Sequence, residues 1–436
     1  MAHNTTYDVL AALPKKQKLF WEIDGLSRDE LDVFLLKGNP DVYCGAAVRE
    51  KKEMEKYMSF FTYPTDRKTR YGINNNGRLF HYFPVDTDIY EGSGSWQSDS
   101  TEKWRLADKG FREYITKIMN WLEEGRKHDA LTATAGLFHV LQDQCAFFHS
   151  LEGEEGCSQW ILDELVERPA GCLRTPTSLL SEQTPAIDLC RYKPVLLGTD
   201  TEEIIFHLYH RYREVKSANH KLLVPLVQSY YRKDAKGEQT IRGHIGKKVA
   251  ELTYDLIYTI YCFASSDFRR SEVKRLEKVY LSDIKPINYP RHAALPYRFN
   301  TLVRNHSLGD GPEEYLLSLP VDTGRGRREL RFSRGIGMGA HRESIIAYAV
   351  PKGVFGRFHA YFGLHSKLGK DGNVEFELRF GGKRKMKEQL NKNNPAVEIN
   401  LDVKSGGLLQ FIIGTKKGVK ASCNNLVLAE PCLTKS

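Results

Sequence analysis

Two residues in the stretch GLFHVLQDQCAFFHSLEG, residues 136–153, have the types and spacing that could bind a metal ion. His139 and Asp143 stand four residues apart, so in a helix their side chains lie on one face, one turn from each other. An imidazole and a carboxylate so placed can hold a cation such as Zn²⁺. The alternative is a buried histidine satisfied by a neighbouring carboxylate, which is the commoner outcome for an isolated pair of this spacing.

Further imidazoles and carboxylates lie outside this stretch. Asp41 follows Asn39-Pro40, a turn signal after an expected short helix, and His81 begins an aromatic-rich segment that we expect to be a long loop. His210 and Glu214 are again four apart in an expected helix, where His207 competes with His210. No thiolate joins this set, and ligands of histidine and carboxylate alone favour catalytic over structural zinc.

Taken together, these residues resemble the zinc-dependent phospholipase C proteins, whose all-helical fold is shared with zinc nucleases that prefer single strands. The central signature of that family, H-x3-D-x5-H, fits His139, Asp143 and His149, and its later H-x3-E is matched by His210 and Glu214. The nuclease branch tends to have aspartate in the last place. The resemblance spans about residues 10–264 and favours the lipase branch.

The resemblance implies two zinc ions, and it assigns a catalytic base as well as ligands. The first ion would be held by Asp41, His81, His139 and Asp143, and the second by His149, His210 and Glu214. Asp41 would also be the candidate base. The third site of the family uses an N-terminal tryptophan and a nearby histidine, for which this chain offers only His3, so we expect two ions.

The chain also departs from the family pattern. The gap between His149 and His210 is longer than the family has, and Phe147 replaces a proline. In an unbroken helix His149 would lie about 15 Å along the axis from His139. It could then serve only a second ion, unless the helix breaks.

Length and composition set the wider limits. A chain of 436 residues with 41% hydrophobic residues predicts two domains, with three as an alternative. A net charge of +9 is modest for this length, whereas dedicated nucleic-acid binders carry denser basic stripes. No apolar run is long enough for a transmembrane helix, and the N-terminus lacks a signal-peptide pattern. The eight cysteines have no CxxC spacing, and a bridge among Cys157, Cys172 and Cys190 or free thiols both remain open.

Hydrophobic periodicity divides the chain into a helical and a β half. Helices are predicted near residues 111–122, 127–152, 201–216 and 238–264, with Thr201 as the N-cap of the third. A charged, proline-bearing linker is expected over residues 265–296. Beyond it, eight β-forming runs predict a sandwich or jelly roll over residues 297–436. The fold class is therefore an all-α domain, residues 1–264, followed by an all-β sandwich.

The β half resembles an NPCBM-type carbohydrate-binding module. The stretch RGIGMGAHRESIIAYAVPKGVFGRFHAYFGLH carries the resemblance, together with VEFELRFGGK and NNLVLAE. Gly335, Gly337, Phe358 and Gly363 are expected to build turns and core. Basic residues that follow the fifth run, Lys383, Arg384, Lys385 and Lys387, are expected to form a solvated loop.

Together with the resemblance to zinc-dependent phospholipase C, the residues predict a zinc-dependent phosphodiester hydrolase that attacks through a metal-bound water. The resemblances imply phospholipid as its substrate and a possible glycan as the ligand of the β module. A single-strand zinc nuclease is the alternative enzyme. A glycan-binding protein with a vestigial metal site is the alternative without catalysis. The resemblance favours secretion while the chain shows no leader pattern, so location stays open, as does the oligomeric state.

Overall fold

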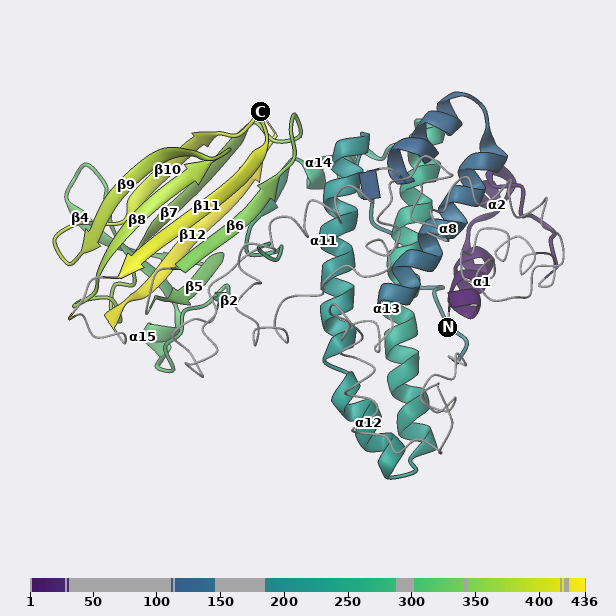
Figure 1. Ribbon diagram of the computed structural model, residues 1–436, viewed down its shortest axis with the longest axis horizontal. Helices are drawn as coiled ribbons and strands as arrows, with labels where there is room; N and C mark the ends of the chain where they lie inside the picture. The colour runs from purple at the N-terminus through teal and green to yellow at the C-terminus, as the bar shows by residue number, and fades with distance from the viewer. Residues whose placement is uncertain are drawn as a thin grey trace, which may run out of the picture. The chain divides into compact units, whose positions relative to one another are not determined.

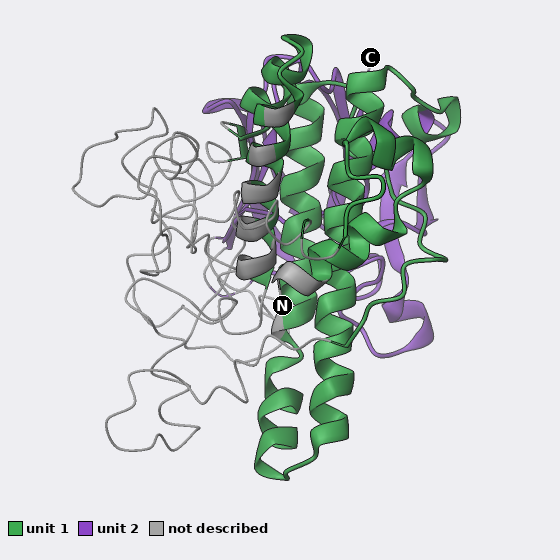
Figure 2. Cartoon of the chain, turned by 90° about the vertical axis from the view of Figure 1, so that its right-hand side faces the viewer, with its two compact units in different colours: residues 1–90, 103–273 green, residues 91–102, 274–436 purple. Residues whose placement is uncertain are grey.

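The chain divides into two compact units, residues 1–90 with 103–273 and residues 91–102 with 274–436 (Figure 2). The structure, a computed structural model, describes residues 2–27, 30, 111–112, 114–145, 185–287, 302–340, 344–415, 418 and 423–435. The described part of the first unit is mainly helical, and strands predominate in that of the second. This order confirms the predicted fold class, an all-α half followed by a β-sandwich.

The helical unit is built around one long helix, α13 (Ala235–Ser265), which α1, α8, α11 and α12 all contact (Figure 1). The predicted stripe of α13, Val249, Leu252, Leu256 and Ile260, is fully buried. The other bounds are α1 (Ala2–Ala12), α2 (Lys15–Phe20), α8 (Lys127–Cys145), α11 (Thr201–His220), α12 (Leu223–Tyr231) and α14 (Arg270–Leu276), with a further helix within residues 111–123. That further helix buries Phe111, Tyr114, Ile115, Ile118 and Met119, as its periodicity predicts.

The start of α11 differs from the prediction by one residue. Asp200, not Thr201, is the N-cap, and its side chain accepts a 3.0 Å hydrogen bond from the Glu203 backbone amide. The Glu203 carboxylate in turn accepts a 2.8 Å bond from the Thr199 amide, one residue before the cap. A carboxylate at the cap satisfies an amide that the first turn leaves open. Gly198 is required here, because a Cβ would lie 2.5 Å from the Ile204 nitrogen.

The β unit is a two-sheet antiparallel sandwich with an added hairpin. One sheet has the order β10-β7-β12-β5-β2, with β1 also paired to β12, and the other has the order β6-β11-β8-β9. The third pair is β3-β4. The bounds are β1 (Lys278–Tyr280), β2 (Leu302–Arg304), α15 (Pro312–Tyr315), β3 (Leu317–Asp322), β4 (Arg327–Phe332), β5 (Gly335–Gly339), β6 (Ser344–Val350), β7 (Arg357–Leu364), β8 (Asn373–Phe380), β9 (Lys383–Asn391), β10 (Val397–Asp402), β11 (Gly407–Thr415) and β12 (Asn425–Thr434).

Aromatic rings fill the space between the two sheets. Phe358 and Phe362 point inward from β7 and meet Phe376 of β8 and Phe411 of β11, and all four are fully buried. Phe358 is thus a core residue, as expected. Gly363 also has a packing role, because a Cβ there would lie 2.7 Å from the Ala396 side chain. These contacts support the interpretation that this part of the module motif builds the core.

Two predictions for the β half need correction. The expected linker over residues 265–296 contains helix α14 and strand β1, and β1 pairs with the end of β12 in a register that joins Val279 to Leu433. The β unit therefore begins before residue 297, because its last strand needs this partner. The expected loop at residues 383–387 is strand β9, which lies at the edge of its sheet and pairs with β8 alone among the strands that the structure describes. Its Lys and Arg side chains are exposed, so the expectation that they are solvated holds.

No helix in the described part of the chain is long and apolar enough to cross a membrane.

Candidate functional site

The seven predicted metal ligands are described to different extents. Asp41, His81 and His149 lie outside the described residues. The structure places His139 and Asp143 in the last turns of α8, where only the backbone of these two residues is described. The remaining two ligands, His210 and Glu214, have described side chains and lie in the middle of α11.

His210 is held in an aromatic environment in the helical unit. Its side chain is only 4% exposed. The Phe206 ring meets the imidazole edge to face at 4.6 Å between centroids, and the Tyr209 ring does so at 5.4 Å. Glu214, one turn further along, is half-buried. A buried imidazole with a carboxylate one turn away is the arrangement that the spacing of these two residues predicts.

Helices α8 and α11 run side by side in the same direction. At the start of α8, the Lys127 ammonium lies 4.8 Å from the centre of the Phe20 ring, and Phe20 contacts Tyr261 near the end of α13. The segment that leads into α11 is anchored at the same end of α13, because the Leu197 amide donates a 2.9 Å hydrogen bond to the Thr259 hydroxyl. Both helices therefore begin near the end of α13 and run antiparallel to it.

A buried hydrogen bond sets the register between the two helices at their other ends. The Asn219 side-chain amide donates a 2.9 Å bond to the Cys145 carbonyl, the last residue of α8. At a rise of 1.5 Å per residue, His139 and Asp143 lie about 9 and 3 Å before Cys145 along the axis, while Glu214 and His210 lie about 8 and 14 Å before Asn219. His139 and Glu214 thus lie at about the same level, although some 70 residues separate them in the sequence. Asp143 lies nearer the common end of the two helices, and His210 lies further from it.

The comparison of α8 with α11 concerns the positions of backbone atoms along the two helices and the types of the candidate ligands. Among the residues whose side chains the structure describes, no group of three or more His, Cys, Asp and Glu is close enough to hold a metal ion. The described donors, the imidazole of His210 and the carboxylate of Glu214, are of the types that zinc accepts. These two side chains therefore suit zinc, but they are only part of the predicted ligand set. The other candidates lie on α8 or outside the described residues.

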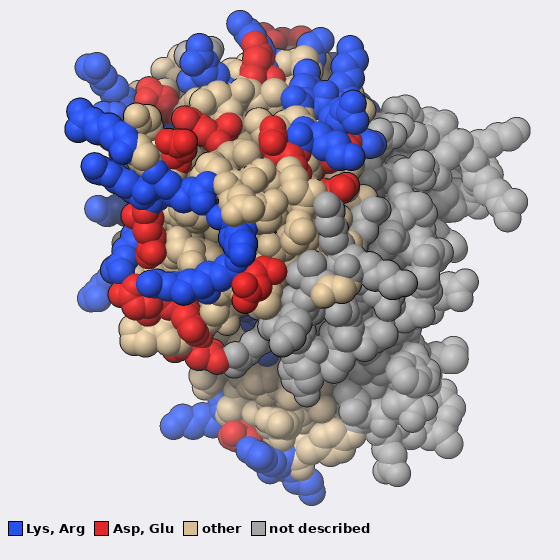
Figure 3. All heavy atoms as spheres, turned by 90° about the vertical axis from the view of Figure 1, so that its left-hand side faces the viewer, with Lys and Arg blue, Asp and Glu red and all other residues tan. Residues whose placement is uncertain are grey.

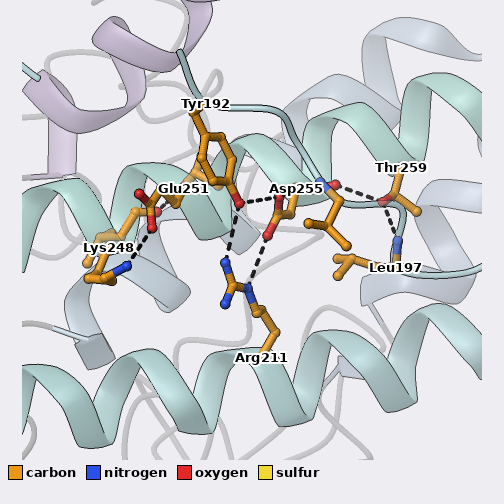
Figure 4. Close-up of polar contacts among 10 residues, drawn as sticks. Tyr192, Leu197, Arg211, Lys248, Glu251, Asp255 and Thr259 are labelled. Atoms are coloured by element: carbon orange, nitrogen blue, oxygen red, sulfur yellow. Dashed lines mark hydrogen bonds and ion pairs between the residues drawn. The ribbon is translucent and has the colours of Figure 1, made fainter. Parts of the chain in front are cut away.

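Sequence reasoning missed a buried polar cluster that ties α13 to its neighbours (Figure 4). The fully buried Asp255 carboxylate accepts hydrogen bonds from the Tyr192 hydroxyl and the Val195 amide, both at 2.7 Å, and from the Arg211 guanidinium at 3.2 Å. Burial raises the pKa of Asp255 to about 6, against the opposing effect of the Arg211 charge. The partners come from two segments, residues 185–200 and α11, that are distant from Asp255 in the sequence, so no local pattern signals the cluster. It holds the 185–200 segment and α11 on α13.

The β unit presents a second candidate surface on the outer face of its six-stranded sheet. Tyr280, Cys432, His359 and Asn400 occupy one row across β1, β12, β7 and β10, because each is the direct partner of the next. Directly paired residues share a face of the sheet. The row is therefore a continuous strip of side chains four strands wide.

Next to this row, an aromatic ring meets a set of polar groups. Tyr361 contacts the Phe332 ring of the β3-β4 hairpin at 5.7 Å and the His359 ring at 5.2 Å. The Glu398 carboxylate lies 3.2 Å from His359 Nε2 and accepts a 3.3 Å bond from the Asn400 amide. Burial, and then the neighbouring Glu398, raise the pKa of Tyr361. A half-buried ring beside a carboxylate, an amide and an imidazole is chemically suited to hold a sugar ring and its hydroxyls.

Comparison with protein families bears on this unit. Residues 277–434 match the family model described as the NPCBM/NEW2 domain. The C-terminal unit carries an NPCBM/NEW2 domain. Its matched range begins at β1 and ends at β12, which agrees with the early start of the β unit. The NPCBM-type resemblance noted in the sequence is thereby confirmed for this part of the chain.

Solved structures give low-similarity matches, some over about a third of the chain and some over nearly all of it. The CBM51 module of Clostridium perfringens GH95, solved with methyl-galactose, is 16% identical over 36% of this chain and 99% of that chain, with a TM-score of 0.30. The alpha-toxin of Clostridium perfringens from avian strain SWCP is 11% identical over 97% of this chain and 84% of that chain, with a TM-score of 0.29. The alpha toxin of Clostridium absonum is 10% identical over 97% and 85%, with a TM-score of 0.31. No curated protein sequence matches the chain.

Proposed function

We propose that the helical unit is a zinc-dependent phosphodiester hydrolase with phospholipid as its first expected substrate. The observation that supports it is the Asn219–Cys145 hydrogen bond, which sets α8 and α11 in a register where one residue of each predicted ligand pair, His139 and Glu214, lies at about the same level. The buried position of His210 adds to it, since a ligand imidazole shielded from water is held in one orientation. The distant likeness to alpha-toxins agrees with this proposal but does not carry it.

The residues of the chain would contribute in three ways. His210 and Glu214 would hold one ion with His149, while His139 and Asp143 would hold the other with Asp41 and His81. Asp41 would also accept a proton from the attacking water. Zinc, when bound, supplies Lewis-acid chemistry, in which it polarises the phosphodiester and brings the pKa of water toward neutrality. The Phe206 and Tyr209 rings would keep the His210 imidazole in place and exclude water from its faces.

Zinc content of the purified full-length chain tests the ligand assignment. We expect two ions per chain by elemental analysis, and about one in His210→Ala and in Glu214→Gln. His207→Ala, on the same helix, separates the competing histidine from His210, and His244→Ala, at an exposed position of α13, is the matched control. Less than one zinc per wild-type chain, or unchanged zinc in His210→Ala, would contradict the proposal.

Substrate choice is tested separately. With zinc bound, we expect faster hydrolysis of a short-chain phosphodiester lipid than of a single-stranded oligonucleotide. The reverse order would favour the nuclease alternative. Zinc binding without hydrolysis of either would favour the non-catalytic one.

A second function, glycan binding, is favoured by the NPCBM/NEW2 match over residues 277–434. We propose the outer face around Tyr361 as the binding surface, with the ring stacked on a sugar and Glu398 and Asn400 bonded to its hydroxyls. A panel of mono- and disaccharides that includes methyl-galactose should yield a ligand by calorimetry. Tyr361→Ala and Glu398→Gln should each weaken binding about tenfold or more.

The matched control for the glycan test is Glu375→Gln, which changes an exposed carboxylate on the other sheet. An equal loss of affinity in this control, or undiminished binding in Tyr361→Ala, would remove the outer face as the site.

A further inference from the structure

Strand β9 carries the densest basic segment in the described part of the β unit. Four of the five residues at positions 383–387 are Lys or Arg, in the order Lys-Arg-Lys-Met-Lys, and all four are exposed. Among the described strands, β9 is an edge strand whose one partner is β8, so no described strand pairs with its other side. Edge strands often carry lysine to prevent strand-to-strand association. If the basic residues of β9 served only to prevent such association, no further cations would be needed near them.

Further cations do gather at the same end of the sandwich. The tight turn that joins β8 to β9, Gly381-Gly382, has both residues at positive φ and bonds to the start of β11 through the Leu408 carbonyl. The neighbouring turns that carry Lys352 and Lys404 are joined to each other, because the Gly353 amide donates to the Lys404 carbonyl at 3.0 Å. A Cβ on Gly407 would lie 3.1 Å from Gly381, so the Lys404 turn reaches the β8-β9 turn. Three turns thus bring separate lysines together.

We call the five exposed cations Lys352, Lys383, Arg384, Lys385 and Lys404 the basic strip. Within the described residues, none of these five side chains contacts a carboxylate. By contrast, Lys387 pairs with Glu375 at 3.6 Å, and Arg379 pairs with Glu377. Figure 3 shows Lys and Arg side chains in clusters on one face of the molecule, with Asp and Glu side chains between them. The strip is therefore the part of β9 and its turns where positive charge is left uncompensated.

The pairing of β8 with β9 brings like charges together in this region. Arg384 is the direct partner of Arg379, and the ladder shifts register between Leu378 and Arg379, leaving Lys385 out of the paired residues. Like charges directly opposite each other on a sheet destabilise it. Glu377 already pairs with Arg379, so the charges left without a carboxylate here are those of Arg384 and Lys385, and a bound anion would offset their repulsion.

We propose that the basic strip binds a linear acidic polysaccharide, one that carries sulfate or carboxylate groups. Residues 383–387 extend about 13 Å along the strand, which matches a few sugar units. A chain laid along an edge strand can reach each charge in turn. A membrane surface fits less well, because the exposed large hydrophobic residues of the described part of the chain, Leu19, Leu26, Val195, Val224, Tyr231, Tyr315 and Leu316, all lie outside the strip. A single-stranded nucleic acid would need aromatic stacking platforms, and the strip has no aromatic residue.

The proposal does not rest on the hydrolase or on the Tyr361 surface, since it uses neither unit 1 nor the outer face of the six-stranded sheet. The test uses the full-length chain and heparin as a sulfated probe. In Lys383→Gln/Arg384→Gln/Lys385→Gln we expect affinity for heparin to fall about tenfold at low ionic strength and the protein to elute earlier from heparin resin. The matched control, Lys221→Gln/Lys236→Gln/Lys247→Gln, makes the same change of net charge on exposed residues of the helical unit and should bind as the wild type does.

Each other outcome would overturn the proposal. Unchanged heparin binding in the β9 variant would show that the strip is a solvated edge alone. An equal loss in the control would show a response to net charge. Tighter binding to a single-stranded oligonucleotide or to anionic vesicles than to heparin, lost in the β9 variant, would assign the strip to that ligand instead. A thermal unfolding profile matching the wild type confirms that the variant is folded.

Discussion

The two units place their polar groups in opposite ways. In the helical unit the notable polar groups are buried and paired: Asp255 has three hydrogen-bond partners, and His210 lies among aromatic rings. In the β unit they lie on open sheet faces and edges, where Glu398 and the basic strip are exposed. A helix bundle can surround a side chain from several sides, whereas the outer face of a sheet has one side open to water. We therefore expect enclosed chemistry in the first unit and recognition of extended ligands in the second.

The largest effect should come from the apolar core of the β unit. Phe358→Ala removes a fully buried ring that packs on Phe411. We expect it to lower the free energy of unfolding of this unit by about 3–5 kcal/mol, because the change leaves a cavity between two sheets. Hydrogen exchange read by mass spectrometry should show loss of protection in β7. Protection in α13 serves as the internal reference, and an equal loss there would mean that the two units unfold together.

A buried carboxylate should make the stability of the helical unit depend on pH. The pKa of Asp255 is raised from its ordinary 3.8 to about 6, so the folded state holds this proton more tightly than the unfolded chain does. Its contribution to stability is therefore greatest below pH 4 and is lost as the pH rises to 6. Asp255→Asn removes this titration, so the wild type should gain up to about 3 kcal/mol relative to the variant as the pH falls from 6 to 4.

Helix ellipticity at 222 nm during urea unfolding measures this difference. A constant gap between wild type and Asp255→Asn across that pH range would show that the carboxylate titrates normally. Burial in the helical unit would then not perturb the Asp255 carboxylate, and the two units would not differ in this respect.

The smallest of the three effects concerns the start of α11. Asp200→Ala removes the side chain that caps the Glu203 amide, and we expect a loss of about 1 kcal/mol in the helical unit. Thr201→Ala, at the position that the sequence suggested for the cap, should cost less. Thermal unfolding of the two variants compares them directly. A larger loss for Thr201→Ala would restore the original assignment.

Local sequence patterns predicted most of the secondary structure. They failed at β9 and at the start of α11, where two local signals pointed to different structures. The stripe of α13 and the run that became β7 show a single periodicity over many residues, so their burial follows from spacing alone. β9 has a Lys-rich composition that is typical of loops, and only the Gly-Gly turn before it indicates a hairpin. At the start of α11, Asp200-x-x-Glu203 is itself a capping signal, and it begins one residue before Thr201, the predicted N-cap.

By itself, the sequence determined the order of an all-α and an all-β half, the faces that are buried, and the types and spacing of the candidate metal ligands. These depend on contacts within one helix or strand, which spacing encodes. Tertiary structure alone decided which helices share a level, since the register of α8 against α11 depends on a bond between residues 74 positions apart. It also decided that Asp255 is enclosed by partners from separate segments and that three turns gather the lysines near β9. Such tertiary contacts arise from packing between segments that are distant in the sequence, and local sequence patterns do not predict them.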